Sequence, residues 1–142
     1  MTLGVLLRIA AALDIRITVI PRWRGGELDR LLDARHAALA ERVATYLAGL
    51  PGWVLSPEVS FAFYAERGRI DILAWHPSTR SLLVIELKTE ITDVQDTLGV
   101  LDMKRRHARR IAAERGWRAG SVSVWLVVAG TRTNRRQADS RA

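Results

Sequence analysis

The chain has 142 residues, of which 49% are hydrophobic and 26% are charged, with a formal net charge of +7 and no cysteine. These values fit one globular domain with a real hydrophobic core, and they exclude a disordered chain, a disulfide framework and a thiolate metal site. No apolar run approaches the roughly 18 residues of a membrane span and the start does not resemble a secretion signal, so we expect a cytoplasmic protein without a membrane partner.

The N-terminal half predicts a helix, a strand and a long helix. Residues 3–13 read as a short helix, and residues 15–20 alternate apolar and polar side chains as an edge or half-buried strand does. Pro21 and the Gly25-Gly26 pair interrupt this pattern. A long amphipathic helix is expected over residues 27–50, ended by Pro51 and Gly52. Its apolar stripe consists of Leu28, Leu32, Leu39, Val43, Leu47 and Leu50.

Three strands are expected next. The first covers residues 53–64, with Pro57, Val59, Phe61 and Phe63 on one face and Glu58 on the other. Residues 68–75 and 81–88 read as a hairpin, and the nearly continuous apolar run 82–87 is typical of a central strand that is covered on both faces.

The last two elements are a helix and a strand. The spacing of Thr92 and Gln95 is that of a capping box, which predicts a helix from Thr92 to about residue 115, ended by Gly116. An apolar strand follows over residues 121–128, and we expect a loose tail from Thr131. The whole order predicts an α/β layer arrangement.

Two carboxylates are expected to meet across the hairpin. If Ser78 and Thr79 form the centre of the turn, paired residues have numbers that sum to 157, and Asp71 falls opposite Glu86. Their separation would be about 5 Å, which is repulsive without a cation between them. Lys88 lies two residues after Glu86 and so points to the same face. This arrangement predicts a site for a divalent metal and a phosphate.

These residues resemble the PD-(D/E)XK nuclease-like superfamily, which carries an acidic residue on its second core strand and Glu-x-Lys on its third. The matching residues are Asp71, Glu86 and Lys88, with Ile70 where the superfamily has proline. The resemblance implies a restriction-endonuclease-like αβββαβ core with a mixed central sheet flanked by helices. Here the core carries an extra N-terminal helix and strand.

The resemblance also implies a division of the chain. Residues 26–130 form the nuclease-like domain, and residues 131–142 form a basic flexible tail. Residues 1–25 look like a remnant of a helix-turn-helix module, because the chain resembles domains that follow such modules in actinobacterial proteins.

The resemblance assigns catalytic roles. Asp71 and Glu86 would bind Mg²⁺ or Mn²⁺ with the Leu87 carbonyl, and Lys88 would hold the attacking water or the phosphate. A third acid is usual, for which we favour Glu58 over Glu41, because Glu41 lies far from the apolar stripe of its helix and should face solvent.

Each assignment has a structural alternative. Asp71 and Glu86 could instead form salt bridges to an arginine such as Arg69, and Lys88 could be a solvated strand end. Glu58 could be an exposed strand glutamate. Gln95 resembles an auxiliary glutamine of some members, but the capping box with Thr92 is the stronger explanation and needs no chemistry.

The positive charge is concentrated in the C-terminal third. Residues 1–99 carry 11 basic and 12 acidic residues, whereas residues 100–142 carry 11 basic and 3 acidic ones. Clustered Arg and Lys neutralise phosphates, so this part predicts contact with DNA, the alternative being a solvated basic helix. The candidates are Lys104, Arg105, Arg106, Arg109, Arg110, Arg132, Arg135 and Arg136. His36, His76 and His107 show no metal-ligand spacing and are expected to be packing or surface residues.

Together these patterns predict a metal-dependent nuclease, an endodeoxyribonuclease that hydrolyses DNA with a metal-activated water. A catalytically silent DNA-binding or regulatory module on the same fold is the alternative. A third hypothesis is a homodimer in which the N-terminal helix and strand pack against a second copy.

Overall fold

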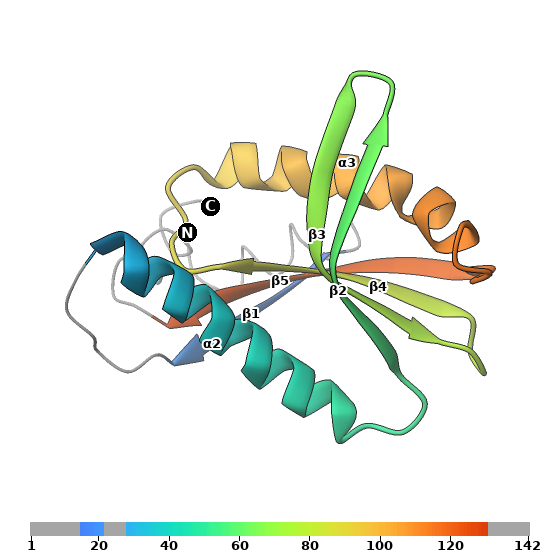
Figure 1. Ribbon diagram of the computed structural model, residues 1–142, viewed down its shortest axis with the longest axis horizontal. Coiled ribbons are helices and arrows are strands. Elements are labelled where there is room, and N and C mark those ends of the chain that lie inside the picture. Colours follow the sequence, from blue (N-terminus) through green and yellow to red (C-terminus); the bar gives the residue numbers. More distant parts are fainter. Residues whose placement is uncertain (1–14, 22–27, 131–142) are drawn as a thin grey trace.

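Five strands form one mixed sheet in the computed structural model, which describes residues 15–21 and 28–130 (Figure 1). The strand order is β1-β5-β4-β3-β2. Strands β1, β5 and β4 are parallel, whereas β3 is antiparallel to β4 and β2 is antiparallel to β3. The bounds are β1 Ile15–Pro21, β2 Val54–Phe63, β3 Glu66–His76, β4 Ser81–Lys88 and β5 Ser121–Gly130.

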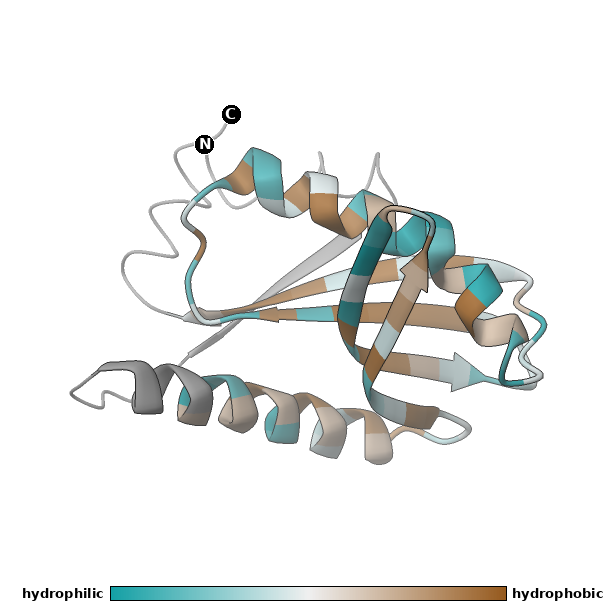
Figure 2. Cartoon of the chain, turned by 45° about the horizontal axis from the view of Figure 1, so that its top comes forward, coloured by the Kyte–Doolittle hydropathy of each residue, from teal (hydrophilic) through white to brown (hydrophobic). Residues whose placement is uncertain are grey.

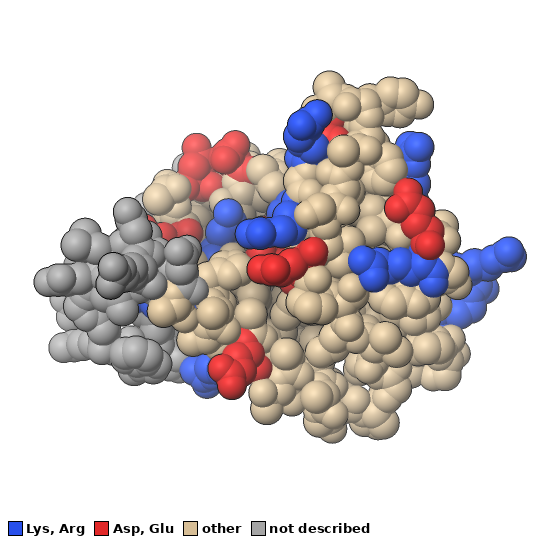
Figure 3. All heavy atoms as spheres, in the orientation of Figure 1, with Lys and Arg blue, Asp and Glu red and all other residues tan. Residues whose placement is uncertain are grey.

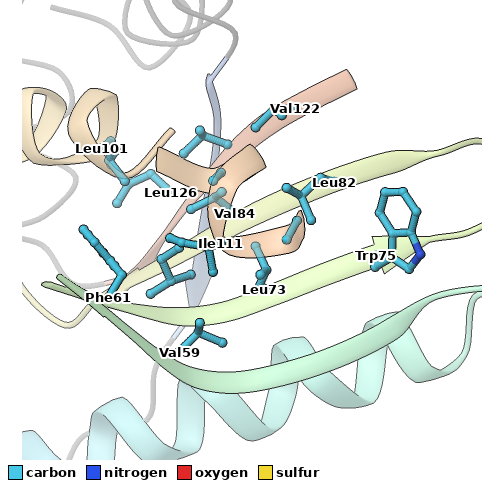
Figure 4. Close-up of a cluster of buried hydrophobic side chains, with 14 of the residues drawn as sticks. Val59, Phe61, Leu73, Trp75, Leu82, Val84, Leu101, Ile111, Val122 and Leu126 are labelled. Carbon is cyan, nitrogen blue, oxygen red and sulfur yellow. The ribbon is translucent and has the colours of Figure 1, made fainter. Parts of the chain in front are cut away.

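Two helices flank the sheet, α2 (Leu28–Ala48) on one face and α3 (Val94–Ala113) on the other (Figure 1). Leu39, Val43 and Leu47 of the predicted stripe are buried on the side of α2 that faces the sheet. Leu50 lies past the end of the helix and is exposed. The larger apolar cluster lies under α3 and includes Leu73, Val84 and Leu101 (Figure 4). In Figure 2 the central strands are mostly brown, while α3 mixes teal and brown as an amphipathic helix does. The α/β class is therefore confirmed.

The predicted central strand is confirmed. All side chains from Leu82 to Leu87 are buried on β4, including the charged Glu86. The predicted hairpin register is also confirmed, because β3 and β4 pair from Ile72–Ile85 to His76–Ser81 with numbers that sum to 157.

The hairpin of β2 and β3 bends out of the sheet, and its outer half stands beside α3 (Figure 1). Glu58 has a φ of 51°, in the left-handed region that non-glycine residues rarely adopt. Pro57 lies on the α2 side, whereas Val59 and Phe61 belong to the cluster under α3. The prediction that Pro57 shares a face with these residues is therefore wrong, because the bend interrupts the alternation of side chains.

The ends of α3 differ slightly from the prediction. The N-cap is Asp93, not Thr92, and its side chain accepts a hydrogen bond from Asp96 N at 3.0 Å. The helix ends at Ala113, and Gly116 follows with a φ of 77°, the conformation for which glycine is suited.

Some sequence predictions fall outside the described residues. These are the helix over residues 3–13, the helix-turn-helix remnant that it suggests, and the tail with Arg132, Arg135 and Arg136. Neither helix in the described part of the chain has the length and apolar character needed to cross a membrane.

Candidate active site

Asp71 and Glu86 are buried neighbours at the point where β3 separates from β4. Their exposed fractions are 8% and 6%. The β3–β4 ladder ends at the pair Ile72–Ile85, so Asp71 and Glu86 stand one position beyond it, in the predicted register. Carboxylates of this degree of burial need partners, because desolvation disfavours their charged form.

Asp71 has a partner for each carboxylate oxygen. Its Oδ2 accepts a hydrogen bond from the backbone N–H of Leu87 at 2.8 Å. Its Oδ1 lies 3.2 Å from Nε2 of His36, which comes from α2 and is 36% exposed. Asp71 therefore links β3 to β4 and to α2.

Glu86 is paired with a lysine from α3. Nζ of Lys104 donates to Glu86 Oε2 at 2.7 Å and to the backbone oxygen of Arg69 at 2.7 Å. Burial, followed by the charge of Asp71, raises the pKa of Glu86 from its ordinary 4.5 to about 7, although Lys104 opposes the shift. Glu86 therefore retains its proton up to nearly neutral pH.

Lys104 does not belong to an exposed basic face. The prediction that it lies with the arginines of α3 to contact phosphates is wrong, because its side chain is only 6% exposed. It shares the buried stripe of α3 with Leu101, Ala108 and Ile111, at spacings of three, four and seven residues. The aliphatic stem packs within this stripe while the ammonium reaches Glu86.

Lys88 lies at the end of β4 and is half-buried. By strand alternation it has the same orientation as Glu86. In the described part of the chain, Lys88 forms no ion pair. The approach of its ammonium to the carboxylate pair stays a prediction.

A pocket of about 660 Å³ opens beside Asp71 between α2 and the bent hairpin. Glu58 stands opposite Asp71, between the pairs Pro57–Ile72 and Val59–Ile70. Glu41 is exposed as predicted, but it faces this pocket rather than remote solvent. The structure thus brings both candidates for the third acid to the same pocket, which is lined by His36, Ala37, Ala40, Glu41, Ala44, Leu55, Pro57, Glu58, Arg69, Asp71 and Ile72.

The donor set is compatible with a divalent cation in its chemistry. Carboxylate oxygens are the ligands that Mg²⁺ and Mn²⁺ prefer, and a cation would offset the repulsion between Asp71 and Glu86. Leu87 enters the site through its N–H, and its carbonyl as a ligand stays a prediction. Among residues 15–21 and 28–130, no group of three or more His, Cys, Asp or Glu side chains is arranged to hold a metal ion.

Gln95 is exposed in the first turn of α3. No hydrogen bond joins it to the carboxylate pair within the described residues. Its auxiliary role stays a prediction, but the capping role is wrong, because Asp93 and Asp96 form the cap.

The arginines of α3 mostly contact the protein itself. Arg106 pairs with Glu66 at 3.2 Å and with Asp102 at 3.4 Å. Arg109 donates to the backbone oxygens of Ala119 and Gly120. Arg110 lies 4.2 Å above the Phe63 ring, while Arg105 is half-buried. These contacts engage several of the arginines within the protein, and their contact with DNA stays a prediction.

The histidines divide into two structural residues and one site residue. His76 bonds to the Pro51 carbonyl at 3.2 Å and to the β3–β4 turn, and His107 bonds to Glu66 at 3.1 Å. His36 contacts Asp71, which the sequence analysis missed. The available signal was its spacing of three and seven residues from Leu39 and Val43, which puts it on the inner side of α2.

Comparisons of this chain with protein-family models, with curated proteins and with solved structures return no match.

Proposed function

We propose that this chain is a nuclease-like domain of the restriction-endonuclease-like fold that hydrolyses DNA phosphodiester bonds with a divalent metal ion. The observation that carries this proposal is the buried pair of Asp71 and Glu86, with the pKa of Glu86 raised to about 7. Pairs of buried carboxylates with a perturbed pKa are commoner at functional sites than elsewhere. The helix, three-strand meander, helix and parallel strand supply the expected framework.

The residues have distinct proposed roles. Asp71 and Glu86 hold Mg²⁺ or Mn²⁺, which when bound makes a hydroxide available near neutral pH and offsets charge on the phosphate. Lys88 orients the attacking water through its ammonium group. Glu58 acts as the auxiliary acid from its position on β2, directly across from Asp71. The proposed substrate is DNA, so we also propose that the protein works in the cytoplasm.

The test is cleavage of duplex, single-stranded and branched DNA with Mg²⁺ or Mn²⁺. Wild type should cleave at least one substrate, and Lys88→Ala should lose most of that activity. Arg118→Ala is the control, because it also removes one cation, but from an exposed position away from the carboxylates. It should cleave as wild type does. Equal inactivity of wild type and Lys88→Ala on all three substrates would contradict the proposal.

Metal binding is tested separately by titration with Mn²⁺. Wild type should bind saturably and Asp71→Asn should not, because the neutral amide is a poor ligand for a hard cation. Asp102→Asn removes an exposed acid from α3 and should bind as wild type does.

A catalytically silent DNA-binding module is the second candidate, and the Lys104–Glu86 pair favours it. The ammonium already balances the charge of Glu86 at 2.7 Å, and Asp71 already has partners on both oxygens. A silent module should bind DNA in a salt-dependent manner that ignores Mn²⁺. Salt-dependent binding without metal uptake by wild type would therefore favour this candidate over the enzyme.

A further inference from the structure

The outer half of the β2–β3 hairpin projects beside α3 (Figure 1). An exposed aromatic residue lies at its tip, between β2 and β3. Tyr64 is 95% exposed at the tip and has a φ of 58°. This conformation is strained for a bulky residue, and glycine or asparagine would form the turn at lower cost. The solvated ring contributes nothing evident to the core, so folding does not explain a tyrosine at this position.

The inner face of the hairpin is anchored on α3. Phe61 and Phe63 stack at 6.1 Å, and both rings contact the imidazole of His107. Lys104 adds a hydrogen bond to the Arg69 carbonyl at 2.7 Å. The hairpin is therefore held in one orientation, and its outer face is the one left for a partner.

The outer face carries two cations among small residues. Arg67 and Arg69 are both exposed, and they pair across the hairpin with Ala62 and Ser60. Neither guanidinium forms an ion pair with any of the described residues. Small neighbours leave the guanidinium groups open to an anion. Figure 3 shows basic side chains on the projecting hairpin, with basic and acidic ones side by side near its base.

This face leads directly to the carboxylate pair. Arg67, Arg69 and Asp71 alternate along β3, so their Cα atoms follow one another at intervals of about 6–7 Å. Arg69 also lines the pocket that opens beside Asp71. A polyanion bound by the two arginines would therefore lie beside the pocket that Asp71, Glu41 and Glu58 line.

We propose that the outer face of the hairpin, formed by Tyr64, Arg67 and Arg69, binds single-stranded DNA and leads it into the pocket beside Asp71. The arginines contact phosphates, and the Tyr64 ring stacks on an unpaired base. This inference rests on the proposed function, because DNA bound beside Asp71 is hydrolysed only if that function holds.

Two features favour a single strand over a duplex. Asp71 is recessed, with an exposed fraction of 8%, in the pocket between α2 and the hairpin, so a flexible strand can approach it where a rigid duplex is kept outside. An exposed tyrosine can stack only on a base whose face is free. Both arguments concern access, and neither depends on a sequence preference.

The test measures binding by fluorescence anisotropy in EDTA, with a labelled oligothymidine and with the same strand annealed to its complement. Wild type should bind the single strand more tightly. The double variant Arg67→Gln/Arg69→Gln should bind it at least tenfold more weakly. Its salt dependence should also fall, by about 0.7 per lost phosphate contact in the slope of log K against log salt. Tyr64→Ser should weaken binding about tenfold, whereas Tyr64→Phe should retain it.

Arg106→Gln/Arg109→Gln removes the same charge from α3 and is the matched control. It should bind as wild type does if its circular dichroism shows an intact fold. Wild-type affinity in the hairpin variants, loss of binding in the α3 variant alone, or duplex binding as tight as single-strand binding would each overturn the proposal. Hairpin-dependent binding by a protein that cleaves no DNA would support this surface and contradict only the proposed hydrolysis.

Discussion

Asp71 Oδ2 accepts a hydrogen bond from Leu87 N–H at 2.8 Å where β3 leaves β4. Beyond Ile72–Ile85 the strands separate, and the N–H of Leu87 would be buried without a backbone acceptor. The carboxylate supplies that acceptor. Asp71 therefore stabilises the separation of the strands in addition to its proposed role towards a metal ion, and variants must distinguish the two roles.

Asp71→Asn and Asp71→Ala should differ in stability. Asparagine keeps an oxygen that can accept from Leu87 N–H, whereas alanine leaves this N–H unsatisfied, which costs about 1–3 kcal/mol of unfolding free energy. Urea unfolding measures the difference, and Asp102→Ala on the exposed side of α3 is the control. Equal stability of the two Asp71 variants would show that the hydrogen bond does not matter.

The stability of the protein should fall as the pH rises towards 7. The pKa of Glu86 is about 7 when folded against 4.5 ordinarily, so the folded state binds a proton that the unfolded state has released. This contribution is fully present below about pH 4.5 and is lost as the pH rises through the folded pKa, with a total of about 3 kcal/mol.

The measurement is the unfolding free energy of wild type and Glu86→Gln at pH 5 and pH 8 in EDTA. The variant cannot titrate at this position, so the drop between the two pH values should be smaller in Glu86→Gln than in wild type. All other groups are the same in both proteins, so their contributions cancel in the comparison. An identical drop would contradict a protonated Glu86.

Lys104→Met should destabilise the protein strongly at pH 8. Removing one partner of a buried ion pair leaves the other charge uncompensated, which costs about 3–5 kcal/mol. The loss should be smaller at pH 5, where Glu86 is protonated, and Glu86→Gln should restore part of it in the double variant. Arg106→Met breaks exposed pairs and should have little effect, because solvent screens them. Wild-type stability of Lys104→Met at pH 8 would show that the pair is dispensable.

Two glycines should respond to alanine in opposite directions. At Gly52 the φ is 93° and an added Cβ would lie 2.5 Å from Nε2 of His76, so Gly52→Ala should lose about 1 kcal/mol or more. At Gly99 an added Cβ meets nothing within 4 Å on α3, so Gly99→Ala should gain about 0.5–1 kcal/mol. Thermal unfolding of both variants beside wild type tests the pair, and a shift of the same sign in both would contradict the local geometry.

The register of β3 and β4 could be predicted because it depends on local features. The position of the short turn at Ser78 and Thr79 determines which residues face each other, and the pair Ile72–Ile85 follows from it. The switch of faces in β2 could not be predicted, because Glu58 adopts a positive φ without the glycine that usually signals one.

The partners of the carboxylates were harder to predict than the carboxylates themselves. His36 and Lys104 both follow the apolar stripes of their helices, yet the sequence analysis assigned His36 to packing or surface and Lys104 to an exposed basic face. Helical spacing shows which side of a helix a residue occupies. It does not show which charge on a distant strand that side will meet.

By itself the sequence determined the α/β order of elements, the central position of β4 and the meeting of Asp71 with Glu86, because these depend on short-range periodicity and one tight turn. Only the tertiary structure decided that Lys104 neutralises Glu86, that His36 reaches Asp71 and that Arg67 and Arg69 remain unpaired within the described residues. These contacts join segments 18 to 35 residues apart across different faces of the sheet, so the packing of α2, α3 and the bent hairpin determines them.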